Sequence, residues 1–119
     1  MTNTTKFTWS DVAAEAVACF DRYGMSRSDD FDGWSLLPEV PGVRLEATAM
    51  IINFREEVCV EVYRFDGSSR MQIVLPWARF RDAEGDRNPD ATFLDEVDEA
   101  VLDAVRIIRR AEDQARSGG

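Results

Sequence analysis

The middle of the chain repeats with a period of two residues. Three stretches, residues 43–53, 58–65 and 71–80, place apolar side chains at alternate positions over part or all of their length. Successive side chains of a strand point to opposite faces, so this period indicates strands with one buried face. Asp66-Gly67 is typical of a β-hairpin turn. We therefore expect a three-stranded antiparallel meander, whose last strand is an edge because Pro76 cannot donate to a ladder.

Helical periods flank these strands. Between residues 9 and 23, apolar residues recur every three or four positions, after a capping box that Thr8 opens and before Gly24, where helices commonly end. A second apolar stripe starts near Pro89 or Thr92, and Thr92 opens another capping box. The sequence thus predicts an α+β, two-layer domain in the order helix, three-stranded antiparallel meander, helix, with both helices on one face of the sheet.

We expect one domain over residues 1–119, since a chain of this length buries about two thirds of its unfolded surface. Flexible ends are expected at about residues 1–6 and 115–119. The stretch 24–42 contains glycine and proline breakers but is unusually long for a structureless loop. Two interpretations stay open: residues 34–37 form a short strand, or the segment is a functional loop.

The composition excludes several functions. The 119 residues include no histidine, and 14 basic residues face 23 acidic ones, for a net charge of −9. Without histidine, the usual Ser-His-Asp and Cys-His nucleophile systems are excluded. The acidity argues against direct nucleic-acid binding, which needs clustered positive charge. Glu46 and Glu61 could lie on adjacent strands, but beside Arg44 and Arg64 we expect surface ion pairs rather than a catalytic pair. We expect no enzyme activity.

Residues 28–39 come closest to a metal-binding motif. They align with a calcium loop, with Gly33 at its sixth position, but Ser28 replaces the first aspartate. Pro41 follows where the motif requires a helix. We therefore expect a polar turn here. We also expect no metal, since two cysteines cannot make a structural zinc site by themselves, and no cofactor, since no glycine-rich loop could hold phosphates.

Cys19 and Cys59 lie forty positions apart without a CxxC spacing. This spacing is typical of two buried thiols in a reducing compartment. No signal peptide and no membrane-spanning stretch is expected, which favours a cytoplasmic location. Thirteen of the 14 basic residues are arginine, a bias found in GC-rich bacterial or phage genomes.

Acidic residues concentrate between positions 82 and 103, where nine acids accompany one arginine. Helix capping explains some of them, because carboxylates stabilise a helix N-terminus. The remainder form either a solvated face or a docking surface for a basic partner. The candidate partner-binding acids are Asp82, Glu84, Asp86, Asp90, Asp95, Glu96, Glu99 and Asp103.

Trp34 is a further candidate partner-binding residue. It stands between an acidic cluster and Leu36-Leu37 in the long segment. An exposed tryptophan on a loop is a typical interface anchor. The alternative is that Trp34 and Leu36 fold down and close one end of the core.

The second face of the meander is half apolar. Two helices cover only one side of the sheet, and a solvated side normally alternates more cleanly than this. The face is thus either ordinary exposed surface or a contact with a partner or second copy. The candidate dimer residues are Met50, Ile52, Cys59, Tyr63 and Val74.

These features favour a small acidic protein that binds a basic surface of another protein, as an inhibitor or adaptor. Immunity proteins and phage anti-defence inhibitors share this general profile, and a particular version is mimicry of nucleic-acid charge. The alternative is a protein like a secretion chaperone, or a homodimeric structural or small-molecule-binding domain, that uses the second sheet face.

Overall fold

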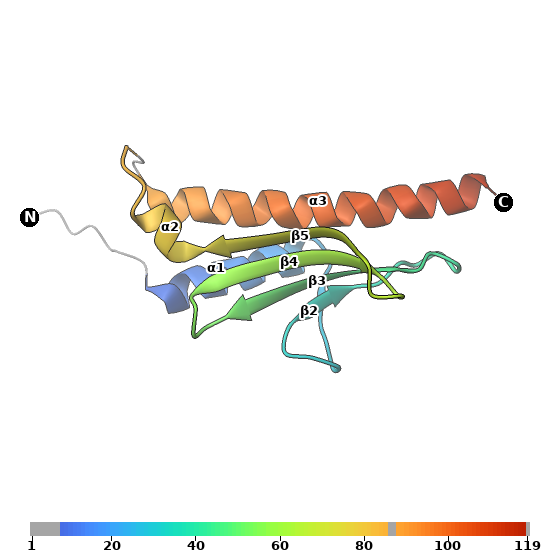
Figure 1. Ribbon diagram of the computed structural model, residues 1–119, viewed down its shortest axis with the longest axis horizontal. Helices are drawn as coiled ribbons and strands as arrows, with labels where there is room; N and C mark the ends of the chain where they lie inside the picture. The colour runs from blue at the N-terminus through green and yellow to red at the C-terminus, as the bar shows by residue number, and fades with distance from the viewer. Residues whose placement is uncertain (1–7, 86–87, 119) are drawn as a thin grey trace, which may run out of the picture.

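The computed structural model describes residues 8–85 and 88–118, and Figure 1 shows their arrangement. The fold is α+β. In chain order its elements are α1 (Trp9–Arg22), β1 (Ser26–Arg27), β2 (Trp34–Leu36), β3 (Leu45–Ile52), β4 (Glu57–Arg64), β5 (Ser69–Pro76), α2 (Trp77–Arg81) and α3 (Pro89–Ser117). Of the two ends predicted to be flexible, residues 1–6 and 119 lie outside the described residues, whereas 115–117 are helical.

The sheet is antiparallel and has five strands in the order β1-β2-β3-β4-β5, so the predicted three-stranded meander is wrong in strand number. The two additional strands lie in the 24–42 segment, where β2 pairs with β3 by placing Trp34 opposite Ala49. The segment therefore contains a short strand, the first of the two interpretations. Strands of two and three residues are too short to show an alternating pattern, which is why the sequence did not predict both.

The predicted third strand is also too long. In the structure, β5 ends at Pro76, and the chain then turns into the short helix α2. The turn lets the Trp77 ring become buried, with its centre 5.8 Å from that of Trp9. As Pro76 predicted, β5 is an edge strand.

The core lies between the sheet and the helices. The alternating residues of β3 and β4 are buried, and α3, which contacts β3, β4 and β5, runs along the sheet in Figure 1. α1 contacts α3, and its Phe20 ring lies 5.2 Å from the ring of Trp34. Burial of an apolar side chain as large as Phe20 contributes about 1.5–3 kcal/mol to stability. The fully buried apolar residues of α3 are Phe93, Val97, Val101, Ala104 and Ile108.

The capping residues explain where the helices begin. The Thr8 hydroxyl accepts a hydrogen bond from the backbone N–H of Asp11 at 3.2 Å, which confirms the first predicted capping box. The capping box predicted at Thr92 is wrong, because α3 begins one turn earlier. There the Asn88 side chain accepts from the N–H of Ala91 at 3.1 Å, and the Thr92 hydroxyl donates to the Asn88 carbonyl.

Candidate functional site

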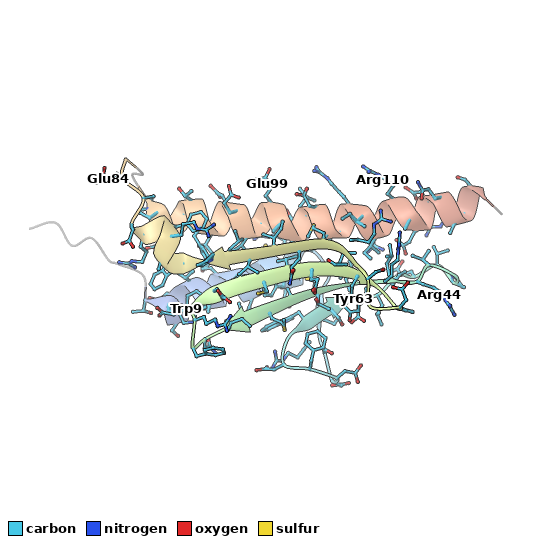
Figure 2. All side chains as sticks on the ribbon, viewed as in Figure 1. Trp9, Arg44, Tyr63, Glu84, Glu99 and Arg110 are labelled. Carbon is cyan, nitrogen blue, oxygen red and sulfur yellow. The ribbon has the colours of Figure 1, made fainter. Side chains whose placement is uncertain are left out.

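The N-terminal half of α3 and the segment before it present exposed carboxylates. None of these carboxylates forms an ion pair with another residue of the described chain. Figure 2 shows Glu84 at the tip before α3 and Glu99 on the side of α3 that faces away from the sheet. We call these residues the acidic surface: Asp82, Glu84, Asp95, Glu96 and Glu99. The further candidate Asp86 lies outside the described residues.

Other acids of the same stretch have partners within the fold. Asp90 is only 9% exposed and accepts a hydrogen bond from the Trp77 indole N–H at 2.8 Å. It is therefore part of the core rather than of an exposed docking surface. Asp103, half-buried, pairs with Arg106 at 3.7 Å, and lies at the border of the acidic surface.

Asp98, on the inner side of α3, links the two long helices. It accepts a hydrogen bond from the Tyr23 hydroxyl at 3.0 Å and pairs with Arg22 at 3.6 Å. The hydrogen bond to this carboxylate raises the pKa of Tyr23. Asp98 thus stabilises the contact between α1 and α3.

Trp34 does not stand on an open loop. It lies in β2, half-buried, and its ring packs against the core. The Arg27 guanidinium covers it at 4.6 Å from the ring centre. The placement matches the interpretation in which Trp34 and Leu36, itself buried, close one end of the core.

The sheet face turned away from α3 is mixed. Met50, Cys59 and Val74 are neighbours across three strands, and Val74 is 41% exposed. Ile52, like Met50 and Cys59, is half-buried. The connection between β1 and β2 lies on this side of the sheet in Figure 1, and Phe31 from that connection lies over Gly33, beside Met50. The chain itself therefore covers part of this face.

Tyr63 lies on the same face and is tied to β3. Its hydroxyl donates a hydrogen bond to the Glu46 carboxylate at 2.8 Å. Burial, followed by the bond to Glu46, raises the pKa of Tyr63 to about 12. Glu46 is thus bonded to a tyrosine, instead of forming the ion pair that the sequence predicted.

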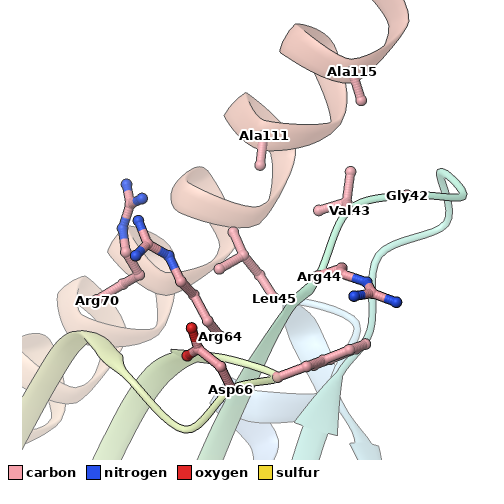
Figure 3. A pocket seen from close by; sticks show the side chains of 10 residues that line it. Gly42, Val43, Arg44, Leu45, Arg64, Asp66, Arg70, Ala111 and Ala115 are labelled. Carbon is pink, nitrogen blue, oxygen red and sulfur yellow. The ribbon is translucent and has the colours of Figure 1, made fainter.

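A pocket of about 570 Å³ opens at the opposite end of the molecule from α2. The start of β3, the β4–β5 turn and the last turns of α3 enclose it, as Figure 3 shows. Arg44, Arg64 and Arg70 all line it. Sequence reasoning missed this cluster, because its arginines come from separate segments. A local signal was the turn at Asp66-Gly67, which brings the end of β4 with Arg64 beside the start of β5 with Arg70.

The described residues offer little for nucleophilic or metal chemistry. Cys19 and Cys59 are both free, and burial raises the pKa of each thiol, which keeps it in the weakly nucleophilic protonated form. No group of three or more histidine, cysteine or acidic residues in this part of the chain could hold a metal ion. No helix of the described chain has both the length and the apolarity needed to cross a membrane.

Comparison with protein-family models, with curated proteins and with solved structures gives no match for this chain.

Proposed function

We propose that this protein is a small, cytoplasmic, non-enzymatic binding protein, an inhibitor or adaptor of the immunity or phage anti-defence type. It docks its acidic surface on a basic region of another protein. The observation that supports this function best is that Asp95, Glu96 and Glu99 are exposed on one helix with no ion pair inside the described chain. Their charge is available to a partner, whereas that of Asp90 and Asp98 is used within the fold.

The helix that carries these acids is rigidly held. Phe93 and Val97, on the opposite side of the same turns, are fully buried, so docking would order little new structure. Asp95 and Glu99 stand four residues apart and repel each other by roughly 0.2–0.5 kcal/mol, a cost that a basic partner would relieve. An unneutralised acidic field also speeds the encounter with a basic protein.

A particular form of this proposal is mimicry of nucleic-acid charge. A row of unpaired carboxylates on a fixed helix resembles a row of phosphates in charge. Such a row would occupy the basic groove of a nuclease or a DNA-binding protein. The partner would then be displaced by a nucleic acid that competes for the same groove.

One observation favours a second candidate, a homodimer, secretion-chaperone-like contact or small-molecule site on the outer sheet face. The row Met50, Cys59 and Val74 is apolar, and Phe54, in the turn after β3, is 84% exposed. A contact made by this face is apolar, so it should survive high salt and be broken by Ile52→Arg, which changes a residue of β3 on the same face. Docking by the acidic surface behaves in the opposite way, because salt screens it.

The test compares capture of partners from the lysate of the native host by two triple variants, with nuclease added and elution by salt. Asp95→Asn/Glu96→Gln/Glu99→Gln neutralises the acidic surface. Glu15→Gln/Asp21→Asn/Asp29→Asn removes the same charge from other exposed acids that form no ion pair in the described chain.

We expect wild type and the second variant to retain one salt-labile protein that the first variant loses. The purified pair should then associate more slowly as ionic strength rises. Equal affinity of the partner for wild type and the first variant would show that the acidic surface is not the docking site.

A further inference from the structure

Arginines without an ion pair gather at one end of the molecule. Among the described residues, five arginines form no ion pair, and four of them line the pocket of Figure 3 or the smaller one that adjoins it: Arg44, Arg64, Arg70 and Arg110. The fifth, Arg79, belongs to α2 at the opposite end (Figure 1). In a chain with 23 acidic residues, this gathering leaves a local excess of positive charge.

The pocket combines these arginines with an apolar floor. Figure 3 shows Ala111 and Ala115 of α3 facing Val43 and Leu45. The small alanine side chains leave open a volume of about 570 Å³, which is within the usual range for small-molecule sites. The adjoining pocket of about 100 Å³ is lined by Leu45, Arg70 and Ala111 as well, and Arg110 extends the basic lining there.

One acid, Asp66, lines the larger pocket, and its carboxylate is hydrogen-bonded to Ser68. The Asp66 carboxylate accepts hydrogen bonds from the backbone N–H of Ser68 at 2.9 Å and from its hydroxyl at 2.7 Å. These bonds, together with the nearby charge of Arg64, lower the pKa of Asp66. Asp66 offsets part of the positive charge without forming an ion pair in the described chain, so the three arginines leave the pocket with a net positive lining.

We propose that this arginine pocket, lined by Arg44, Arg64, Arg70, Leu45 and Ala111, binds a small organic phosphate monoester. The guanidinium groups of Arg64 and Arg70, which lie on the same side of the pocket in Figure 3, would hold the phosphate, since their planar forks match its oxygens. Arg44 adds positive charge from the other side of the pocket. The organic part of the ligand lies on Leu45 and Ala111. This site is separate from the acidic surface, so either assignment can fail while the other holds.

The test is an NMR titration of the ¹⁵N-labelled protein with phenyl phosphate. Its dianionic phosphate and apolar ring match the two parts of the pocket. We expect saturable shifts confined to the amides around Arg44, Phe65 and Ala111. Inorganic phosphate and phenol, the two halves of the probe, should each bind at least tenfold more weakly.

The variant Arg64→Gln/Arg70→Gln removes two guanidinium groups at exposed positions, and its amide spectrum reports whether it is folded. It should bind phenyl phosphate at least tenfold more weakly, because a hydrogen bond to a charged group contributes about this factor or more. Arg79→Gln is the control for each of the single variants Arg64→Gln and Arg70→Gln, since it removes one equally unpaired arginine far from the pocket. It should bind as wild type does.

Several results would overturn the proposal. Shifts that do not saturate, or equal weakening by Arg79→Gln, would show general charge screening. If inorganic phosphate bound as tightly as phenyl phosphate, the pocket would be a phosphate site without a contact between the organic group and Leu45 or Ala111. Salt-sensitive self-association with no response to phenyl phosphate would indicate that the arginines meet the acidic surface of a second copy.

Discussion

Glu112 in α3 accepts a hydrogen bond from the backbone N–H of Glu39 at 2.7 Å and so holds the connection between β2 and β3 against the helix. The other oxygen of the same carboxylate accepts from Arg109 at 2.7 Å. Glu112 is only 1% exposed. One buried acid therefore fixes the segment that leads into Val43 and Leu45, the floor of the arginine pocket.

Replacing this carboxylate should make stability depend less on pH. The bond from Arg109, followed by that from Glu39, lowers the pKa of Glu112 below its unfolded value. Its stabilisation is therefore complete above the unfolded pKa of about 4.3 and is lost as pH falls through the folded pKa. Glu112→Gln should cost about 1 kcal/mol at neutral pH, in urea unfolding, and much less in acid.

Asp113→Asn is the control, because Asp113 is exposed and pairs with Arg116 at 3.4 Å. We expect a change within about 0.5 kcal/mol for this surface pair. A loss for Glu112→Gln that is the same at neutral and acid pH would contradict the role of its charge.

Tyr63 should resist ionisation in the folded protein. Its pKa is raised to about 12, by burial first and by Glu46 second. An unfolded tyrosine ionises near pH 10, so this contribution to stability is complete below about pH 10 and is lost as pH rises towards the folded value. Absorbance of tyrosinate in a pH titration measures this directly.

Glu46→Gln should lower the pKa of Tyr63 only in part, since burial is the larger cause. Glu61→Gln, which removes a smaller charge effect on the same tyrosine, should lower it less. A return to the unfolded value in Glu46→Gln would mean that the carboxylate, rather than burial, controls this hydroxyl.

Gly33→Ala should loosen the β1–β2 hairpin. A methyl group there would stand 2.5 Å from Cε2 of Phe31, 2.7 Å from the Ala49 carbonyl oxygen and 2.9 Å from Cγ of Met50. The backbone oxygen cannot move aside, so we expect a loss of about 1–3 kcal/mol in urea unfolding. Ser35→Ala, on the same face two residues later, should have little effect; equal losses would place the strain elsewhere.

Substitution of two acids of one helix, Asp90 and Asp95, should change stability by very different amounts. Asp90→Ala leaves the buried Trp77 indole N–H without its acceptor and should cost about 1–3 kcal/mol of stability. Asp95→Asn changes an exposed carboxylate and should alter stability by less than about 0.5 kcal/mol. Thermal unfolding separates them, and a stable Asp90→Ala would return this acid to the docking candidates.

Periodicity predicted the long elements because α1, β3, β4 and α3 each repeat a buried face many times. It could not predict β1, whose two residues pair with β2 and are both exposed, so they carry no buried period. Nor could it predict the arginine pocket, because the register of the sheet and the length of α3 bring its side chains together. Glu112 was detectable, since it follows Ile108 by four residues on the buried stripe of α3.

The separation of charge along α3 gives this helix a side-chain dipole moment along its axis. The negative pole lies toward the start of α3 and the positive pole at its end, opposite in sense to the peptide dipole of the helix itself. The electric field of a charged partner would thus orient the molecule before contact, with the end of opposite charge facing that partner. A cationic bead would hold it by the acidic pole and leave the arginine pocket open to solution.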